Sequence, residues 1–86
     1  MEIENYFRMA KIALYSAPHC PYCKMAKRYL ASHGIAFTEH DVASDENAFR
    51  AMEEASHQRG VPVIVIDREV FVGFDREALA RKLGIR

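Results

Sequence analysis

Cys20-Pro21-Tyr22-Cys23 is the stretch that decides the fold, and it holds both cysteines of the 86-residue chain. An apolar run over 11–15 precedes it, and a segment with helical periodicity follows. Pro21 suits the first position of a helix, where a backbone N–H would have no partner. We therefore expect a strand over 11–15, a loop over 16–19 and a helix that begins at Pro21 and ends at Gly34.

The same periodicity predicts which faces of the helices are buried. In the first helix the expected inner residues are Met25, Ala26, Tyr29 and Leu30, and the expected outer residues are Lys24, Lys27 and Arg28. Five further elements are predicted downstream. The first two are a strand over 35–42 and a helix that is capped by Ser44 or Asp45 and runs to about Ser56, with Phe49, Met52 and Ala55 on its inner side. The last three are strands over 63–66 and 70–72, joined by a turn over 67–69, and a helix over 76–83 capped by Asp75.

This order, β-α-β-α-β-β-α, predicts an α/β fold with a four-stranded mixed sheet covered by helices on both faces. The first two strands should be parallel, because a crossover helix joins them. The last two should form an antiparallel hairpin, because only a short turn separates them. We assign residues 10–86 to this one domain and residues 1–9 to an N-terminal extension without a function of its own.

Composition excludes several classes of function. The chain has 12 basic and 12 acidic residues, which argues against a nucleic-acid-binding surface. No apolar run approaches the roughly 20 residues of a membrane span. The N-terminus lacks the basic-then-apolar order of a secretory signal, and two cysteines three apart are no framework for a secreted scaffold. The expected compartment is the cytoplasm.

The two cysteines are expected to differ in chemistry. Cys20 lies at the helix N-terminus, where backbone N–H groups and the helix dipole favour a thiolate, and thiol pKa values of roughly 3.5–7 occur in such motifs. Cys23 lies one turn deeper. Cys20 is thus the predicted nucleophile, and Cys23 the thiol that resolves the mixed disulfide. His19, Lys24 and Lys27 either add positive potential at this site or are ordinary solvated residues.

A metal site is the main rival interpretation. Structural zinc needs four ligands, and His19, His33, His40 and His57 have no finger-like spacing to one another. A dimer sharing its cysteines remains as a zinc or iron–sulfur alternative, and a redoxin that acts as an interaction partner is a third. Our prediction is a monomer with no bound metal or cofactor.

Pro62 stands directly before the apolar strand over 63–66, a place from which proline is normally excluded. We expect a cis Val61–Pro62 bond at the edge of that strand, which would leave the backbone of Val61 free to pair with an extended substrate. A trans proline that only begins the strand is the alternative.

Taken together, Cys20-Pro21-Tyr22-Cys23, Gly60-Val61-Pro62 and Gly73-Phe74-Asp75 make residues 10–84 resemble a dithiol glutaredoxin of the thioredoxin fold. The resemblance implies a thiol–disulfide oxidoreductase that reduces protein disulfides or glutathione mixed disulfides, with glutathione as co-substrate. The residues that it implies for substrate or glutathione binding are Tyr22, Val61, Pro62, Gly73, Phe74 and Asp75.

Three positions depart from the family pattern. Ala17 stands where glutaredoxins have a basic residue, Gly60 where threonine is frequent, and Val72-Gly73 where a Gly-Gly pair is usual. Lys11, Gln58 or Arg59 would have to replace the missing cation as a partner for the glutathione carboxylate. Gly73-Phe74 is also typical of the redoxins that serve ribonucleotide reductase and are themselves reduced by thioredoxin reductase. Both reductants therefore remain open as partners.

Overall fold

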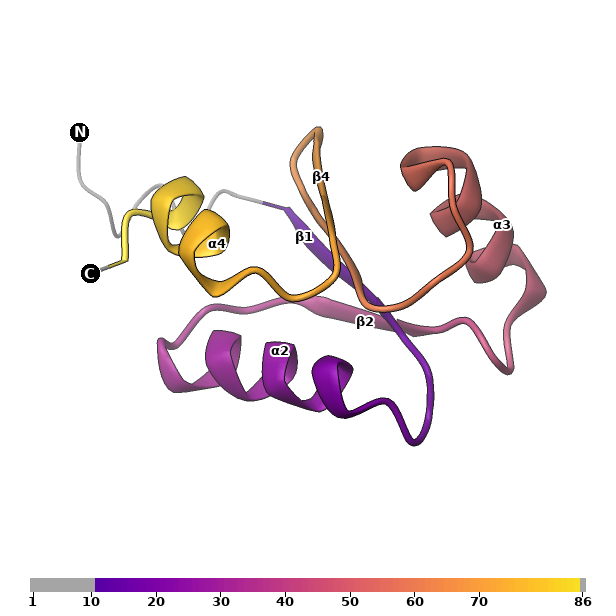
Figure 1. Cartoon of the computed structure of the whole chain (residues 1–86), viewed down its shortest axis with the longest axis horizontal. Helices are drawn as coiled ribbons and strands as arrows, with labels where there is room; N and C mark the ends of the chain where they lie inside the picture. The colour runs from indigo at the N-terminus through magenta and orange to yellow at the C-terminus, as the bar shows by residue number, and fades with distance from the viewer. Residues whose placement is uncertain (1–10, 86) are drawn as a thin grey trace.

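The computed structural model describes residues 11–85, in which seven elements follow one another in the predicted order (Figure 1). Their bounds are β1 Ile12–Ser16, α2 Pro21–Ser32, β2 Thr38–Asp41, α3 Glu46–Ser56, β3 Val63–Ile66, β4 Glu69–Val72 and α4 Arg76–Leu83. The extension predicted over residues 1–9 lies outside the described residues.

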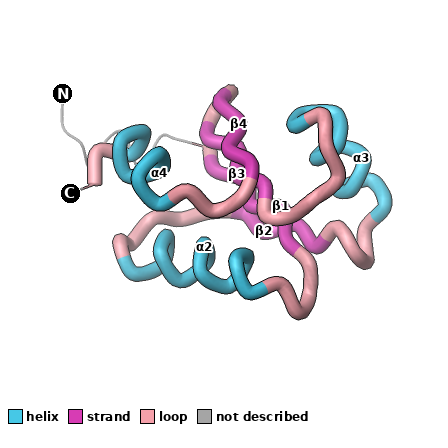
Figure 2. The backbone as a smooth tube through the Cα atoms, in the orientation of Figure 1, coloured by secondary structure: helices cyan, strands magenta, loops and turns pink. Residues whose placement is uncertain are grey.

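The four strands form one mixed sheet in the order β2-β1-β3-β4 (Figure 2). Strand β1 runs parallel to β2 across the α2 crossover, and β3 pairs antiparallel with both β1 and β4, as predicted for the first and last pairs. Leu14 lies opposite Ile64 at the centre of the sheet. The two central strands are apolar, whereas the edge strand β2 reads Thr-Glu-His-Asp.

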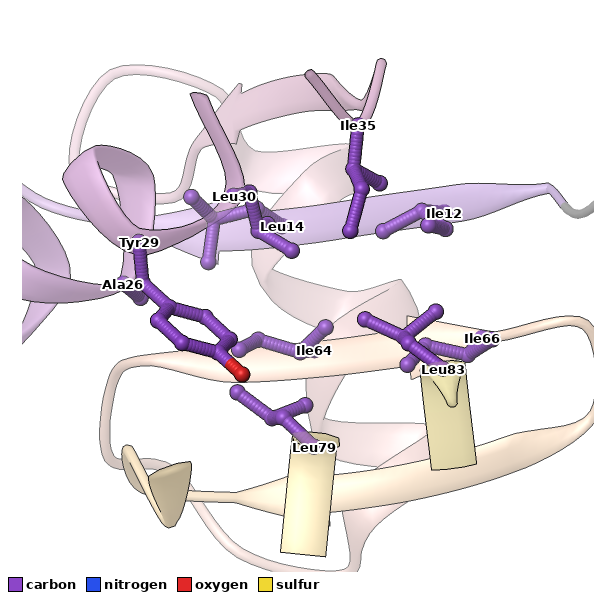
Figure 3. Packing of buried hydrophobic residues seen from close by; sticks show 10 residues of the cluster. All are labelled: Ile12, Leu14, Ala26, Tyr29, Leu30, Ile35, Ile64, Ile66, Leu79 and Leu83. Atoms are coloured by element: carbon purple, nitrogen blue, oxygen red, sulfur yellow. The ribbon is translucent and has the colours of Figure 1, made fainter. Parts of the chain in front are cut away.

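Helices cover both faces, and the two faces are unequal. The main core lies between the sheet and the helices α2 and α4, whose side chains converge on β1 and β3 in Figure 3. Its buried members are Ile12, Leu14, Ala26, Tyr29, Leu30, Ile35, Ile64, Ile66, Leu79 and Leu83. Helix α3 contacts β1, β2 and β4 on the other side and buries Ala48 and Met52.

The second strand is shorter than the 35–42 predicted, because its first residues close helix α2. Gly34 takes a left-handed φ of 68°, as predicted for the residue that ends this helix. The Ile35 N–H then donates to the Leu30 carbonyl at 3.0 Å, and the Gly34 N–H to that of Ala31 at 3.0 Å. This double closure turns Ile35 back into the core beside Leu30.

The turn predicted over 67–69 contains only two residues, because Ile66 pairs directly with Glu69 and β4 begins there. Asp67 adopts a left-handed φ of 56°. Its N–H donates to the Lys11 carbonyl at 2.8 Å, and its carboxylate accepts from the Lys11 N–H at 3.0 Å. The hairpin is thereby tied to the start of β1.

Two predicted helix faces are also corrected. Met25 is 47% exposed, and Cys23 is buried in its place on the inner side of α2. In α3, Ala55 is exposed and Ala48 is buried, while Phe49 is half-buried. Each face is turned by a fraction of a helical turn from the one that apolar spacing predicts.

Candidate active site

Cys20 is the N-cap residue of α2. Its backbone is extended, with φ −104° and ψ 107°, and its Sγ accepts the Cys23 N–H at 3.1 Å. A serine or aspartate oxygen usually occupies this position and satisfies one of the free N–H groups of the first turn. Here a sulfur does so, at the positive end of a 12-residue helix dipole.

The two cysteines form a disulfide in this structure, with their Cα atoms 5.2 Å apart. Cys23 is only 1% exposed, whereas Cys20 is partly exposed. An incoming thiolate or disulfide therefore has access to the sulfur of Cys20 but not to that of Cys23. The asymmetry agrees with the two roles predicted for these residues.

The second wall of the site is the segment around Pro62. The Val61–Pro62 bond is cis, as predicted, and the Pro62 carbonyl accepts the Gly73 N–H at 2.8 Å. Within residues 11–85 the N–H and C=O of Val61 make no hydrogen bond. An extended segment bound beside the disulfide would find both groups available.

A hollow of about 350 Å³ joins this wall to the cysteine motif. It is lined by Tyr22, Val61, Pro62, Val72, Gly73, Phe74 and Asp75. The structure thus brings together all six residues predicted for substrate binding. It adds Val72, which is 54% exposed and which the sequence analysis treated only as a departure from the family pattern.

Asp75 lines this hollow and also caps α4. Its Oδ1 accepts the Ala78 N–H at 3.1 Å, so the capping role predicted from the sequence is present. The N-terminus of α4 opens beside the hollow, which adds free N–H groups and a positive dipole end to its rim.

Gln58 has a different role from the one proposed for it. Its amide donates to the Gly60 carbonyl at 3.0 Å and accepts the Gly60 N–H at 2.7 Å, and it also donates to Ser56 Oγ at 3.0 Å. The side chain therefore holds the loop that leads into Pro62. It is therefore not available to bind the glutathione carboxylate in place of the missing basic residue. No sequence motif predicts this contact.

The other two candidates are Arg59, which has partners of its own, and Lys11, which lies away from the cysteine motif. Arg59 pairs with Glu53 at 3.4 Å and lies 5.2 Å from the centre of the Phe49 ring, on the α3 side. Lys11 lies before β1, at the opposite end of that strand from Cys20. The sequence left open whether one of the three replaces the basic residue that is absent at Ala17, and in this structure Gln58 and Arg59 have other partners.

Lys27, which the sequence placed near the cysteine motif, forms an ion pair with β2. Its ammonium pairs with Glu39 at 3.0 Å, and Glu39 also accepts a 2.7 Å hydrogen bond from the buried Ser16 hydroxyl. The hydrogen bond from Ser16, with the one from Lys27, holds the pKa of Glu39 below its usual 4.5. This network joins β1, β2 and α2, and Ser16 is the last residue of β1 before the loop that leads to Cys20.

Two kinds of feature are absent from residues 11–85. No group of three or more His, Cys, Asp or Glu side chains is arranged to hold a metal ion. No helix in this range combines the length and the apolar character needed to cross a membrane.

A helix N-terminus with two cysteines three apart, facing a cis-proline loop on a mixed sheet, defines a thiol–disulfide redox centre. Comparison with known proteins identifies the family within this class. The glutaredoxin family model matches residues 12–71. The chain belongs to the glutaredoxin family, and it is a thiol–disulfide oxidoreductase with a thioredoxin fold.

Three relatives illustrate the range of similar proteins. An uncharacterized glutaredoxin-like 8.6 kDa protein in a rubredoxin operon of Clostridium pasteurianum is 46% identical, over 76% of this chain and 87% of its own length. The glutaredoxin-like protein NrdH of Lactococcus lactis subsp. cremoris is 34% identical, over 81% and 96%. A crystal structure of a variant of the thioredoxin-like protein BC3987 superposes with a TM-score of 0.84 at 36% identity, over 88% and 97%.

Proposed function

We propose that the protein reduces disulfides of other proteins, or mixed disulfides with glutathione, through Cys20 and Cys23. The observation that carries this proposal is the position of Cys20 Sγ, which accepts a backbone N–H at the start of α2 while Cys23 is buried behind it. The helix dipole favours the anionic sulfur that a nucleophile needs.

The reaction would take two exchanges. The Cys20 thiolate attacks one sulfur of the substrate disulfide, forms a mixed disulfide with it and releases the other sulfur as a thiolate. The Cys23 thiolate then attacks Cys20 Sγ, which releases the second substrate thiol and leaves the Cys20–Cys23 disulfide. The substrate gains two electrons, and the dithiol of this protein loses them.

The proposed roles of the lining residues follow from their place in the hollow. The free N–H and C=O of Val61 pair with the backbone of an extended substrate, and Pro62 shapes that edge. Tyr22, Phe74 and Gly73 form the apolar walls, and Asp75 with the α4 N-terminus faces a substrate amine or carboxylate. We further propose a monomer that works in the cytoplasm without a bound cofactor.

Two electron sources are candidates for regenerating the dithiol. Family membership favours glutathione as co-substrate. The alternative, a thioredoxin reductase, is favoured by the absence of a basic residue at Ala17 and by the engagement of Gln58 and Arg59 away from the disulfide. Without such a cation, the carboxylate of a glutathione glycine loses an anchor.

Reduction of the Cys20–Cys23 disulfide in two coupled assays tests both points. NADPH consumption is followed with glutathione plus glutathione reductase, and separately with thioredoxin reductase alone. Turnover only in the first assay makes glutathione the reductant, and turnover only in the second assigns the chain to the thioredoxin-reductase-linked redoxins. Turnover in neither, with a disulfide that dithiothreitol readily reduces, would contradict both.

A further inference from the structure

We propose that the groove between α2 and α4 binds an acidic, extended segment of the protein that carries the target disulfide. This inference rests on the proposed function, because it names the class of substrate that the redox centre would accept. The α2–α4 groove is defined here as the hollow lined by Met25, Arg28, Tyr29, Ser32, Phe74 and Arg76.

The groove borders the hollow at the active site. Its volume is about 380 Å³, and it shares Phe74 with the hollow beside the cysteine motif. At its other end it shares Tyr29 and Arg76 with a third hollow of about 310 Å³. A chain that places its disulfide at Cys20 therefore has a path to follow along the surface between the two helices.

The charged side chains that line the groove itself are both basic, and the nearest carboxylates, Asp75 and Glu77, line the two neighbouring hollows. No carboxylate lines it, and its two guanidinium groups belong to none of the ion pairs formed among residues 11–85. Arg76 lies 5.7 Å from the centre of the Tyr29 ring, which places it along the wall. Since the whole chain has a net charge of zero, this local excess of positive charge favours an anionic partner.

Exposed apolar residues gather near the same site. The large hydrophobic residues that are exposed in the described part of the chain are Tyr22, Met25 and Val72. Tyr22 and Val72 line the hollow at the disulfide, and Met25 lines the groove. Methionine adapts its shape to different partners, so this rim suits an apolar side chain of the substrate next to its cysteine.

The length of α2 sets the spacing in the substrate. Arg28 lies eight residues after Cys20, which is about 12 Å along the helix axis. An extended chain covers that distance in about three to four residues. The expected segment therefore has its carboxylates about three to four positions from the cysteine, with an apolar residue between them.

Two peptides that differ only in charge test this proposal. Each carries one cysteine, which forms a mixed disulfide with thionitrobenzoate. Leucine residues flank this cysteine in the peptide. One has aspartates three and four positions away on both sides, and the other has asparagines there. Attack by Cys20 on the peptide sulfur releases the coloured thionitrobenzoate anion, and Cys23 then releases the peptide thiol. The rate is measured with pre-reduced protein, so no reductase is needed.

The expected result is that the acidic peptide reacts about 5- to 10-fold faster at low salt, as two exposed ion pairs allow, and that this ratio falls as salt is added. Arg28→Glu/Arg76→Glu should reverse the preference, and Arg28→Gln/Arg76→Gln should bring the ratio to about one. The control Arg68→Glu/Arg81→Glu makes the same change in net charge at two exposed arginines outside the groove, and it should keep the preference.

A neutral small disulfide, 2,2′-dithiodipyridine, distinguishes a failure of the docking proposal from a failure of the proposed function. All these variants should reduce it at the rate of the unsubstituted protein, because it does not reach the groove. A ratio of one in the unsubstituted protein, or an equal loss in the control pair, would overturn the docking proposal alone. Failure of the unsubstituted dithiol to reduce 2,2′-dithiodipyridine would instead overturn the proposed function.

Discussion

At the level of single residues, the redox site consists of two cysteines of opposite accessibility. Cys20 combines access from solvent with a backbone N–H aimed at its sulfur, and Cys23 is enclosed by the protein. Because both lie within one helical turn, the buried sulfur is within reach of the exposed one whenever a mixed disulfide forms. We propose the division into nucleophile and resolving thiol on the basis of this geometry.

Serine substitutions test that division. Cys20→Ser should reduce turnover to the uncatalysed level, because no other thiol is accessible to a substrate. Cys23→Ser should still perform the first exchange and accumulate a stable mixed disulfide at Cys20, which intact-mass spectrometry would detect. A Cys23→Ser protein that forms no adduct, or a Cys20→Ser protein that does, would contradict the assigned roles.

Glu39 gives a residue-level prediction about pH. Its folded-state pKa is lowered by the Ser16 hydrogen bond and by Lys27, so the ionised form stabilises the fold at neutral pH. This stabilisation is present above the unfolded-state pKa near 4.5 and is lost as pH falls through the lower folded-state value. Glu39→Gln should therefore cost about 1 kcal/mol at pH 7, a modest figure because the pair is half-exposed.

Urea unfolding of both proteins at neutral and at acid pH measures this effect. The difference between them should shrink as pH falls from 7 past the unfolded-state value of 4.5 and through the lower folded-state pKa of Glu39, below which both side chains are neutral. Glu46→Gln is the control, because its partner Arg50 is a highly exposed neighbour on the same helix turn and such pairs contribute only about 0.3–0.5 kcal/mol. A pH-independent difference for Glu39→Gln would contradict the argument.

At the level of elements, the chain offers two matched helix caps. Asp45 begins α3 and Asp75 begins α4, and each carboxylate accepts an N–H three residues ahead at 3.1 Å. Alanine at either position should cost about 1 kcal/mol of stability. Only Asp75 lines the hollow beside the disulfide, so only Asp75→Ala should also raise the KM for a peptide or glutathione disulfide. Urea unfolding and steady-state kinetics on both variants make the comparison, and equal kinetics would restrict Asp75 to capping.

The order of elements could be predicted because each signal is local. Pro21 and the cysteine pair set the start of α2, a β-branched run sets β3, and Asp75 sets the start of α4. The end of α2 was predicted at Gly34, but the sequence pattern assigned Ile35 to a strand. Alternation cannot distinguish a strand residue from one that folds back to close a helix.

Some features of the candidate site could likewise be predicted from the sequence, and others could not. The cysteine motif can be seen directly in the sequence. Pro62 before a buried strand allowed either isomer of its peptide bond, and the cysteine motif upstream favoured the cis isomer, which the structure has. The bidentate contact of Gln58 with Gly60 is local, but it depends on a loop conformation that no motif specifies. The exposure of Met25 depends on how α2 packs against the rest of the fold. Neither leaves a trace in spacing or composition, and both affect what the site can bind.

At the level of the whole molecule, one face of the sheet carries most of the core. The side chains of α2 and α4 meet over β1 and β3, so the core that stabilises the fold also joins the two walls of the α2–α4 groove (Figure 3). Of the helices in residues 11–85, α3 is the one that covers the other face. Stability and the shape of the binding surface are therefore expected to depend on the same few aliphatic residues.

Ile64 is the test of this coupling. It is fully buried on β3, opposite Leu14, whereas its neighbour Val65 points to the other face and is half-buried. Ile64→Ala should lower the free energy of unfolding by about 2–5 kcal/mol. The total free energy of unfolding is about 4–13 kcal/mol, at about 0.05–0.15 kcal/mol per residue. Val65→Ala should cost about 1 kcal/mol, because its side chain is already partly in water. Urea unfolding of the oxidised proteins measures both losses. If they proved equal, the core would be shared evenly between the two faces, and the groove walls would have no special dependence on the α2 and α4 side.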